Sequence, residues 1–201
     1  MTRGRLIVFE GLDGSGKTTQ LSWLASALRG AGHPVVTTRE PTGGAYGRRI
    51  RAMAKGSQRV AAEEELRWFV EDRREHVSRV IAPALARGEI VLSDRYYLST
   101  VTYQGARGLD WAAILAQSEA EFPNPDLVLL LEIDPSLGLA RVSERGAGAE
   151  PAFEEKDFLA RVARLYHELP CTYLERLDAR GEPERVREAV GEVVRRRLGL
   201  P

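Results

Sequence analysis

Short apolar runs alternate along the chain with longer stretches whose apolar residues recur at helical spacing. The runs are rich in Val, Ile, Leu or aromatic residues, which is typical of buried strands. The predicted strands cover residues 6–9, 35–38, 90–93, 127–133 and 173–177. The predicted helices cover residues 17–31, 47–55, 61–87, 111–121, 135–144, 153–169 and 183–198, and a further helix follows residues 94–95.

This alternation predicts an α/β fold with a five-stranded parallel sheet. Right-handed crossovers between parallel strands place helices on both faces of a sheet, which gives three layers, α/β/α. Ligands of such folds bind at the carboxyl ends of the strands. The 201 residues fit a single domain, residues 1–201, because no internal repeat or linker divides them.

Composition and charge narrow the range of partners. Basic and acidic residues balance at 29 each, so no overall field attracts nucleic acid or an anionic membrane. The first apolar run is interrupted by Glu10, which excludes both a signal peptide and a spanning helix there. The lone Cys171 cannot form an internal disulfide and fits a reducing cytoplasm. We therefore expect a cytoplasmic protein, whose widely separated histidines are surface or packing residues: His33, His76 and His167.

A phosphate-binding motif directly follows the first predicted strand. It reads Gly11-Leu12-Asp13-Gly14-Ser15-Gly16-Lys17-Thr18, a full match to the P-loop pattern. Glycines let successive amides of such a loop point at phosphate oxygens, and the following helix adds its positive end. We expect Lys17 to bridge the β- and γ-phosphates of ATP and Thr18 to offer its hydroxyl to Mg²⁺. The adjacent Thr19 belongs to the same predicted ATP site.

A P-loop alone does not name a reaction, because switches, ATP-driven machines and kinases share it. A GTPase-like switch would carry a guanine-reading Asn-Lys-x-Asp run, and the sequence has none. The fold class is therefore a P-loop NTPase with room for one nucleotide and a second substrate pocket. The alternative reading of the motif, a glycine-rich turn with an accidental lysine, conflicts with the strand, loop and helix falling where the motif requires them.

Three segments together resemble the bacterial thymidylate kinases. They are Phe9 followed by Glu10 and the P-loop through Gln20, then Thr38-Arg39-Glu40-Pro41, then Ser93-Asp94-Arg95-Tyr96-Tyr97-Leu98-Ser99-Thr100-Val101-Thr102-Tyr103-Gln104-Gly105. The similarity covers nearly the whole chain, and the last two segments are far more specific than the P-loop. The resemblance implies transfer of the γ-phosphoryl of Mg·ATP to dTMP, giving dTDP, by a homodimer. Another nucleotide or nucleoside kinase is the nearest alternative.

Asp94 and Arg95 end a buried strand, so they project into the crevice where parallel sheets bind ligands. Arginine can hold a phosphate through two parallel hydrogen bonds. The resemblance implies that Arg95 clamps the dTMP phosphate and that Asp94 supports the Mg²⁺ shell through water. The alternative is a structural Asp–Arg pair that caps the strand.

The resemblance also assigns the acceptor pocket. Arg39, Glu40 and Arg51 lie beside dTMP, and either Glu40 or Asp13 accepts a hydrogen bond from the 3′-hydroxyl. One departure is Thr42, which stands where the family often runs from Pro41 straight into glycines. A solvent-exposed Arg51 on a helix is the plainer alternative for that residue.

Two predicted helices contribute further acceptor residues. Phe69 and Arg73 are spaced i, i+4 and so share one helix face; the resemblance stacks Phe69 on thymine and lets Arg73 donate to a thymine carbonyl. The alternative places Phe69 in the core and Arg73 in solvent. Residues that recur on one side of the next helix complete the set: Ser99, Thr100, Tyr103 and Gln104. The resemblance implies that Thr100 binds the N3 edge of the base, at a position where the family often has Asn. It also implies that Tyr103 crowds the 2′ position of the sugar.

Transfer of a phosphoryl group needs cations around the moving phosphate. Some thymidylate kinases carry an arginine inside the P-loop, whereas this chain has Ser15 and resembles the type that supplies lid arginines instead. Arg141 and Arg145 are the candidates in a lid segment near residues 141–156, with Lys156 as a weaker third. The Asp-Arg run common later in the lid is replaced by residues 149–152, Ala-Glu-Pro-Ala. Two solvated helix arginines remain the alternative.

Overall fold

The computed structural model describes residues 3–56, 60–144 and 156–201, and its centre is one five-stranded sheet. The strands are β1 (Arg5–Glu10), β2 (Val35–Arg39), β3 (Ile90–Asp94), β4 (Leu127–Glu132) and β5 (Leu174–Asp178). Their order is β2-β3-β1-β4-β5, and every neighbouring pair is parallel. The predicted parallel α/β sheet is confirmed.

The middle strands are buried on both faces, as their unbroken apolar runs predict. In β1, Leu6, Ile7, Val8 and Phe9 have no exposed surface, and the residues of β4 up to Leu131 are almost as fully covered. The edge strands β2 and β5 are only partly buried. Partial exposure is compatible with the polar side chains that these strands contain, among them Thr37, Arg39 and Glu175.

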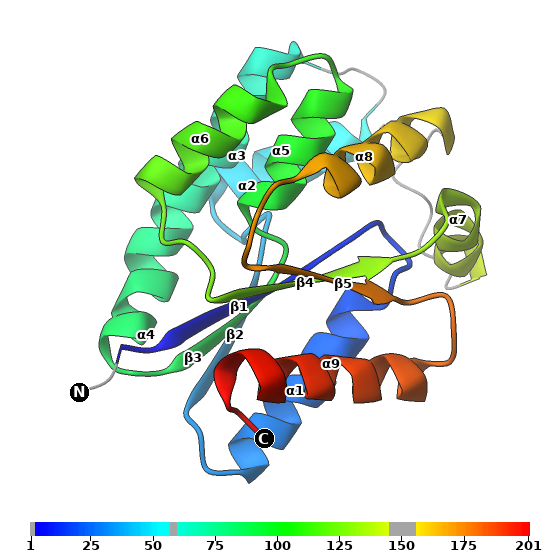
Figure 1. Ribbon diagram of the computed structural model, residues 1–201. Helices are drawn as coiled ribbons and strands as arrows, with labels where there is room; N and C mark the ends of the chain where they lie inside the picture. Colours follow the sequence, from blue (N-terminus) through cyan, green and yellow to red (C-terminus); the bar gives the residue numbers. More distant parts are fainter. Residues whose placement is uncertain (1–2, 57–59, 145–155) are drawn as a thin grey trace.

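Helices cover both faces of this sheet (Figure 1). They are α1 (Lys17–Gly30), α2 (Ala45–Lys55), α3 (Ala62–His76), α4 (Ala82–Ala86), α5 (Tyr97–Ala106), α6 (Trp111–Glu121), α7 (Pro135–Glu144), α8 (Lys156–Glu168) and α9 (Pro183–Leu198). Helices α1 and α9 lie on one face, and α3, α5, α6 and α8 on the other. Across the described parts of the chain, no helix is both long enough and apolar enough to cross a membrane.

The helix predicted over residues 61–87 is present over residues 62–86, with one irregular turn. Between α3 and α4 the chain forms one π-helical turn, η1 (Val77–Ile81), in which the Ala82 amide donates to the Val77 carbonyl. Pro83 follows at the start of α4. Proline has no amide hydrogen and its ring crowds the preceding turn, so the α-helical ladder changes its pairing just before it.

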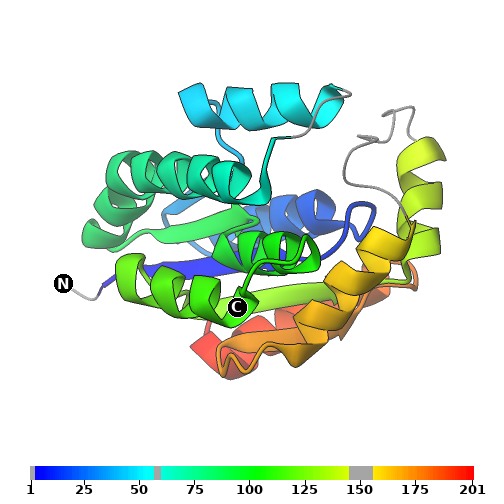
Figure 2. The same cartoon turned by 90° about the horizontal axis from the view of Figure 1, so that it is seen from above.

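The strand registers bring polar residues to one edge of the sheet. Arg39 and Phe9 each lie beside Asp94, and the backbone amides of Glu40 and Arg95 continue this pairing with bonds of 3.0 Å to Asp94 and 2.9 Å to Phe9. Figure 2 shows α7 and α8 at the same end of the molecule as the loop that follows β1. The carboxyl ends of the strands therefore form the floor of the candidate site.

Candidate active site

The loop between β1 and α1 has the backbone that a phosphate cradle needs. Gly11, Gly14 and Gly16 have φ values of 134°, 83° and 92°, in the region that side chains other than glycine rarely adopt. A Cβ at Gly14 would approach the Gly138 carbonyl oxygen of α7 to 2.4 Å. The loop is thus folded tightly and pressed against the first turns of α7.

The Lys17 side chain closes this loop. Its Nζ donates to the carbonyl oxygens of Gly11 at 3.0 Å and Leu12 at 2.9 Å, and only 6% of the residue is exposed. Burial, and then the nearby charge of Arg95, lower the pKa of the Lys17 ammonium. Asp13, with an oxygen 3.6 Å away, acts in the opposite direction.

Thr18 and Asp94 meet beside the loop. The Thr18 hydroxyl donates to Asp94 Oδ2 at 2.7 Å. Among the described residues, no group of three or more His, Cys, Asp or Glu side chains could hold a metal. A hydroxyl paired with one carboxylate fits Mg²⁺, because this ion prefers oxygen ligands and usually keeps waters and substrate phosphates in its shell.

Arg95 lies at the end of β3 with a backbone φ of 71°, the only positive value among the described residues other than glycine. Its Nη1 donates to Ser99 Oγ at 2.8 Å and its Nη2 to Asp13 Oδ1 at 2.5 Å. The charge of Arg95 is the main cause of a lowered pKa for Asp13. A strained backbone position that aims a guanidinium at the P-loop is typical of a functional residue.

A cavity of about 340 Å³, here called the Arg95 cavity, opens beside these residues. It is lined by Asp13, Arg39, Glu40, Pro41, Ile50, Arg51, Ala54, Phe69, Arg95, Ser99 and Tyr103. Three arginines lie at one cavity together with two aromatic rings and two carboxylates. The lining can therefore receive an anionic group and a flat ring in one ligand.

A second cavity of about 320 Å³, the Arg141 cavity, lies on the other side of the P-loop. Gly14, Ser15 and Gly16 line it, together with Thr19, Gln20, Arg141, Glu144, the segment 179–183 and Val186. Arg141 donates to the carbonyl oxygens of Ala179 and Arg180, both at 3.0 Å. The P-loop thus separates two cavities and contributes residues to both.

Comparison with known proteins decides between the kinases that such a site allows. Residues 9–190 match the family model described as Thymidylate kinase. The chain belongs to the thymidylate kinase family. Its activity is accordingly the phosphorylation of dTMP to dTDP, with ATP as the donor.

Curated thymidylate kinases are similar over most of the chain. The protein of Desulfotalea psychrophila is 44% identical over 88% of this chain and 87% of its own length. Those of Xanthomonas campestris pv. campestris and Akkermansia muciniphila are also 44% identical, over 95% and 98% of this chain and 83% and 94% of their own. The family match over residues 9–190 spans every residue that lines the two cavities.

Eight of the eleven residues predicted for dTMP line the Arg95 cavity of this thymidylate kinase family member. The other three, Arg73, Thr100 and Gln104, do not line it. Arg73 is 1% exposed and donates to Thr100 Oγ1 at 2.8 Å, so both stand behind the lining. Gln104 is fully buried and donates to Glu65 Oε1 at 3.0 Å, which ties it to α3.

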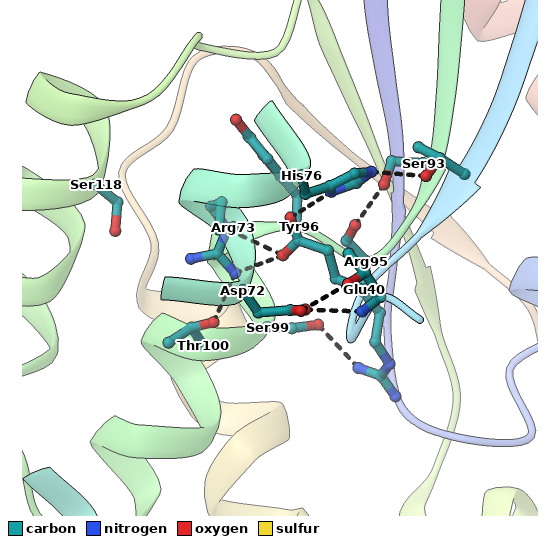
Figure 3. A network of polar contacts seen from close by, with 12 residues as sticks. Glu40, Asp72, Arg73, His76, Ser93, Arg95, Tyr96, Ser99, Thr100 and Ser118 are labelled. Carbon is teal, nitrogen blue, oxygen red and sulfur yellow. Dashed lines mark hydrogen bonds and ion pairs between the residues drawn. The ribbon is translucent and has the colours of Figure 1, made fainter. Parts of the chain in front are cut away.

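Behind the cavity, Arg73 holds Glu40 (Figure 3). Its Nε and Nη2 donate to Glu40 Oε2 at 3.0 and 2.7 Å. Burial alone would raise the pKa of the Glu40 carboxyl, but Arg73 and His76 outweigh it and the pKa is lowered. Glu40 is therefore an ionised carboxylate at neutral pH.

Thr42, the departure from the usual family pattern, is anchored by Asp72 of α3. Asp72 accepts the Thr42 amide at 2.7 Å and the Thr42 hydroxyl at 2.6 Å, while that hydroxyl accepts the Gly44 amide at 2.9 Å. Arg51 donates to the neighbouring Pro41 carbonyl at 2.8 Å. The loop that carries Glu40 is thereby fixed to both α2 and α3.

Glu10 is a site residue that sequence reasoning missed. Its carboxylate accepts the amides of Tyr96 at 2.9 Å and Ser99 at 3.1 Å at the start of α5, and also the hydroxyls of Ser99 and Tyr166. Burial raises its pKa, although Arg95 acts against this. A charged residue that ends a fully buried apolar strand is the signal that could have revealed it.

The predicted lid is only partly described. Arg141 lies on α7 within 3.5 Å of the Gly14 carbonyl oxygen, and Lys156 begins α8. Arg145, residues 145–155 of the lid segment and the start of the helix predicted over 153–169 lie outside the described residues.

Proposed function

We propose that dTMP occupies the Arg95 cavity and the nucleotide of ATP the Arg141 cavity, so that the γ-phosphoryl passes across the P-loop. The carrying observation is that the P-loop lines both cavities, with Asp13 on one side and Gly14 on the other. The acceptor phosphate is already an anion at neutral pH, so the chemistry needs positioning and charge rather than a strong general base.

A coupled ADP-release assay across dTMP, dUMP, dCMP, AMP and GMP tests this proposal. We expect dTMP to give the highest kcat/KM. A preference for another monophosphate would favour a different nucleotide kinase, and ADP release that no acceptor stimulates would overturn the assignment of the Arg95 cavity.

The proposed roles follow the lining of the Arg95 cavity. Arg95, with Arg39 and Arg51, binds the acceptor phosphate, while Phe69 stacks on the thymine ring. Glu40 or Asp13 accepts the 3′-hydroxyl, and Arg73, Thr100 and Gln104 support the base side from behind. Lys17, at the start of α1, binds the β- and γ-phosphates, and the other residues of the segment 11–19 complete the ATP site.

We propose Mg²⁺ as the metal, held by the Thr18 hydroxyl and, through water, by the Asp94 carboxylate. When bound, the ion supplies positive charge against the ATP phosphates. The 2.7 Å contact between the two side chains supports this proposal, because it brings two oxygen ligands to the phosphate loop.

Three further proposals rest on the resemblance and the sequence. We propose that residues 1–201 form one domain with a lid near residues 141–156. We also propose that the protein acts as a homodimer. Its proposed location is the cytoplasm, where it works without nucleic-acid or membrane partners. Sedimentation of the purified chain tests the dimer, and fractionation of cells tests the location.

Tyr103 is expected to select deoxyribose. Its ring lies 5.3 Å from the Arg95 Cζ and stands edge-on to Phe158 at 6.0 Å, which fixes it in the cavity wall. Burial raises the pKa of its hydroxyl to about 12, so the group stays neutral in assays. Tyr103→Ala should relax discrimination between dTMP and its ribo analogue, whereas Tyr103→Phe, which keeps the ring, should change the ratio of kcat/KM values less. Equal ratios in all three proteins would show that Tyr103 only packs.

Arg73→Ala is expected to raise the KM for dTMP more than the KM for ATP. The change removes two charge-assisted hydrogen bonds from buried Glu40. A loss of about 1.5–3 kcal/mol corresponds to about a tenfold to hundredfold rise. Arg74→Ala is the matched control, since this exposed neighbour pairs only with Glu71 and Glu121 among the interactions described. An effect confined to the ATP KM would place Arg73 outside the acceptor site.

A further inference from the structure

His76 belongs to the same face of α3 as two predicted site residues. Phe69, Arg73 and His76 are spaced i, i+4 and i+7, so they form one stripe along the helix. Figure 3 shows the Arg73 and His76 side chains reaching the Glu40 carboxylate from this helix. His76 is 3% exposed, so of the two roles expected for the histidines, surface or packing, it is not on the surface.

The two ring nitrogens of His76 have different partners. Nδ1 lies 2.9 Å from Glu40 Oε1, and Nε2 lies 2.6 Å from Thr38 Oγ1. An ionised carboxylate only accepts hydrogen bonds, so Nδ1 must carry the hydrogen. In the neutral ring Nε2 is then the acceptor of the Thr38 hydroxyl, and the imidazole links the end of β2 to Glu40.

Arg73 and His76 divide the Glu40 carboxylate between them. Arg73 donates twice to Oε2, and His76 is the partner of Oε1 within the described part of the chain. Glu40 lines the Arg95 cavity, whereas His76 lines a surface depression together with Thr38 and Arg39. The hydrogen bond that connects His76 to the lining of the Arg95 cavity is the one to Glu40.

We propose that His76 is a positioning residue of the acceptor site, which fixes the Glu40 carboxylate so that it can receive the sugar of dTMP. This inference rests on the proposed role of Glu40. Without the Nδ1 donor, Oε1 loses its partner and the carboxylate can rotate about its own side chain toward the cavity. The acceptor then meets a displaced negative charge, while the Arg141 cavity is unchanged.

The test compares His76→Leu, His76→Asn and His76→Gln. The asparagine amide can place its N–H where Nδ1 stands, whereas the glutamine amide reaches the position of Nε2. We expect His76→Leu to raise the dTMP KM about tenfold with the ATP KM within twofold. His76→Asn should recover most of this loss and His76→Gln little of it. Thr38→Val is the matched control and should have the smaller effect, because it removes only the far partner.

A double mutant separates this inference from the role of Glu40. If His76 acts through Glu40, His76→Leu combined with Glu40→Gln should raise the dTMP KM no more than Glu40→Gln alone. A silent Glu40→Gln would overturn both the role of Glu40 and the inference. If Glu40→Gln raises the dTMP KM while His76→Leu leaves it unchanged, the inference alone is overturned. Equal rises of the dTMP and ATP KM values in His76→Leu would have the same consequence. Should the leucine variant not fold, the Asn and Gln pair decides: equal dTMP KM values for these two would also overturn it.

Discussion

Replacing Lys17 by methionine is expected to lower kcat by about 10²–10³-fold, because one cation aimed at the transferring phosphate is worth that much in a preorganised site. Methionine fills much of the volume of the buried side chain and removes only the charge and its donors. The buried Gly11 and Leu12 carbonyls lose the Lys17 donor, so a moderate fall in melting temperature should accompany the loss of charge. We therefore expect a folded protein with little transfer.

Steady-state kinetics with both substrates, together with the melting temperature, check this expectation. Lys156→Met is the matched control, since it removes another of the chain's three lysines from the exposed start of α8. A Lys17→Met protein that turns over within about twofold of the parent would contradict the proposed phosphate contact. Loss of both activity and cooperative melting would instead assign Lys17 a role in closing the loop.

The fold could be predicted because its strands carry simple signals. Strands buried on both faces have continuous apolar runs, and these alternate with helical spacing in the intervening segments. The π-helical turn before Pro83 could not be predicted, since a proline inside a helical pattern is compatible with a continuous helix, a kink or a new helix.

The Arg95 cavity was predictable to the extent that its residues stand at strand ends or on one helix face. Parallel register places Glu40 and Arg95 at the same edge, whatever the loops between them do. Which side chains hydrogen-bond to one another at that edge is set by tertiary packing, and the spacing of residues along the sequence does not reveal it. Glu10 and His76 both proved to be buried partners of site residues, and each needs a contact across more than 30 positions of the chain.

Gln104 illustrates the converse limit. Its helical spacing with Ser99 and Thr100 suggested a shared ligand, yet its amide donates to Glu65 on α3. A ten-residue helix packed against α3, α6 and α8 has little surface left for one ligand. Residues a turn apart on such a helix can therefore serve different neighbours, and the Arg95 cavity receives only Ser99 and Tyr103 from α5.

The two lid arginines are expected to affect different kinetic constants: Arg141 the KM for ATP and Arg145 kcat. Arg141 donates to the carbonyls of Ala179 and Arg180, which form one wall of the Arg141 cavity. Arg141→Ala should thus raise the ATP KM, because that wall loses its support. Arg145 follows four positions later in the sequence. Because the P-loop has Ser15 and no arginine, we expect Arg145 to supply the positive charge that the transferred phosphoryl group needs.

Arg145→Ala should then lower kcat by about 10²-fold or more with modest change in either KM, by analogy with arginine fingers worth about 10³–10⁵. Arg145→Lys should recover only part of this, since a point charge does not reproduce the planar guanidinium fork. Lys156→Ala, at the start of α8, is the control and should remain close to the parent. If Arg145→Ala leaves kcat unchanged while Lys156→Ala lowers it strongly, Lys156 at the far end of the lid would be the residue that stabilises the transferring phosphate. The assignment of the two cavities would stand in that case, because it rests on the P-loop residues that line both of them.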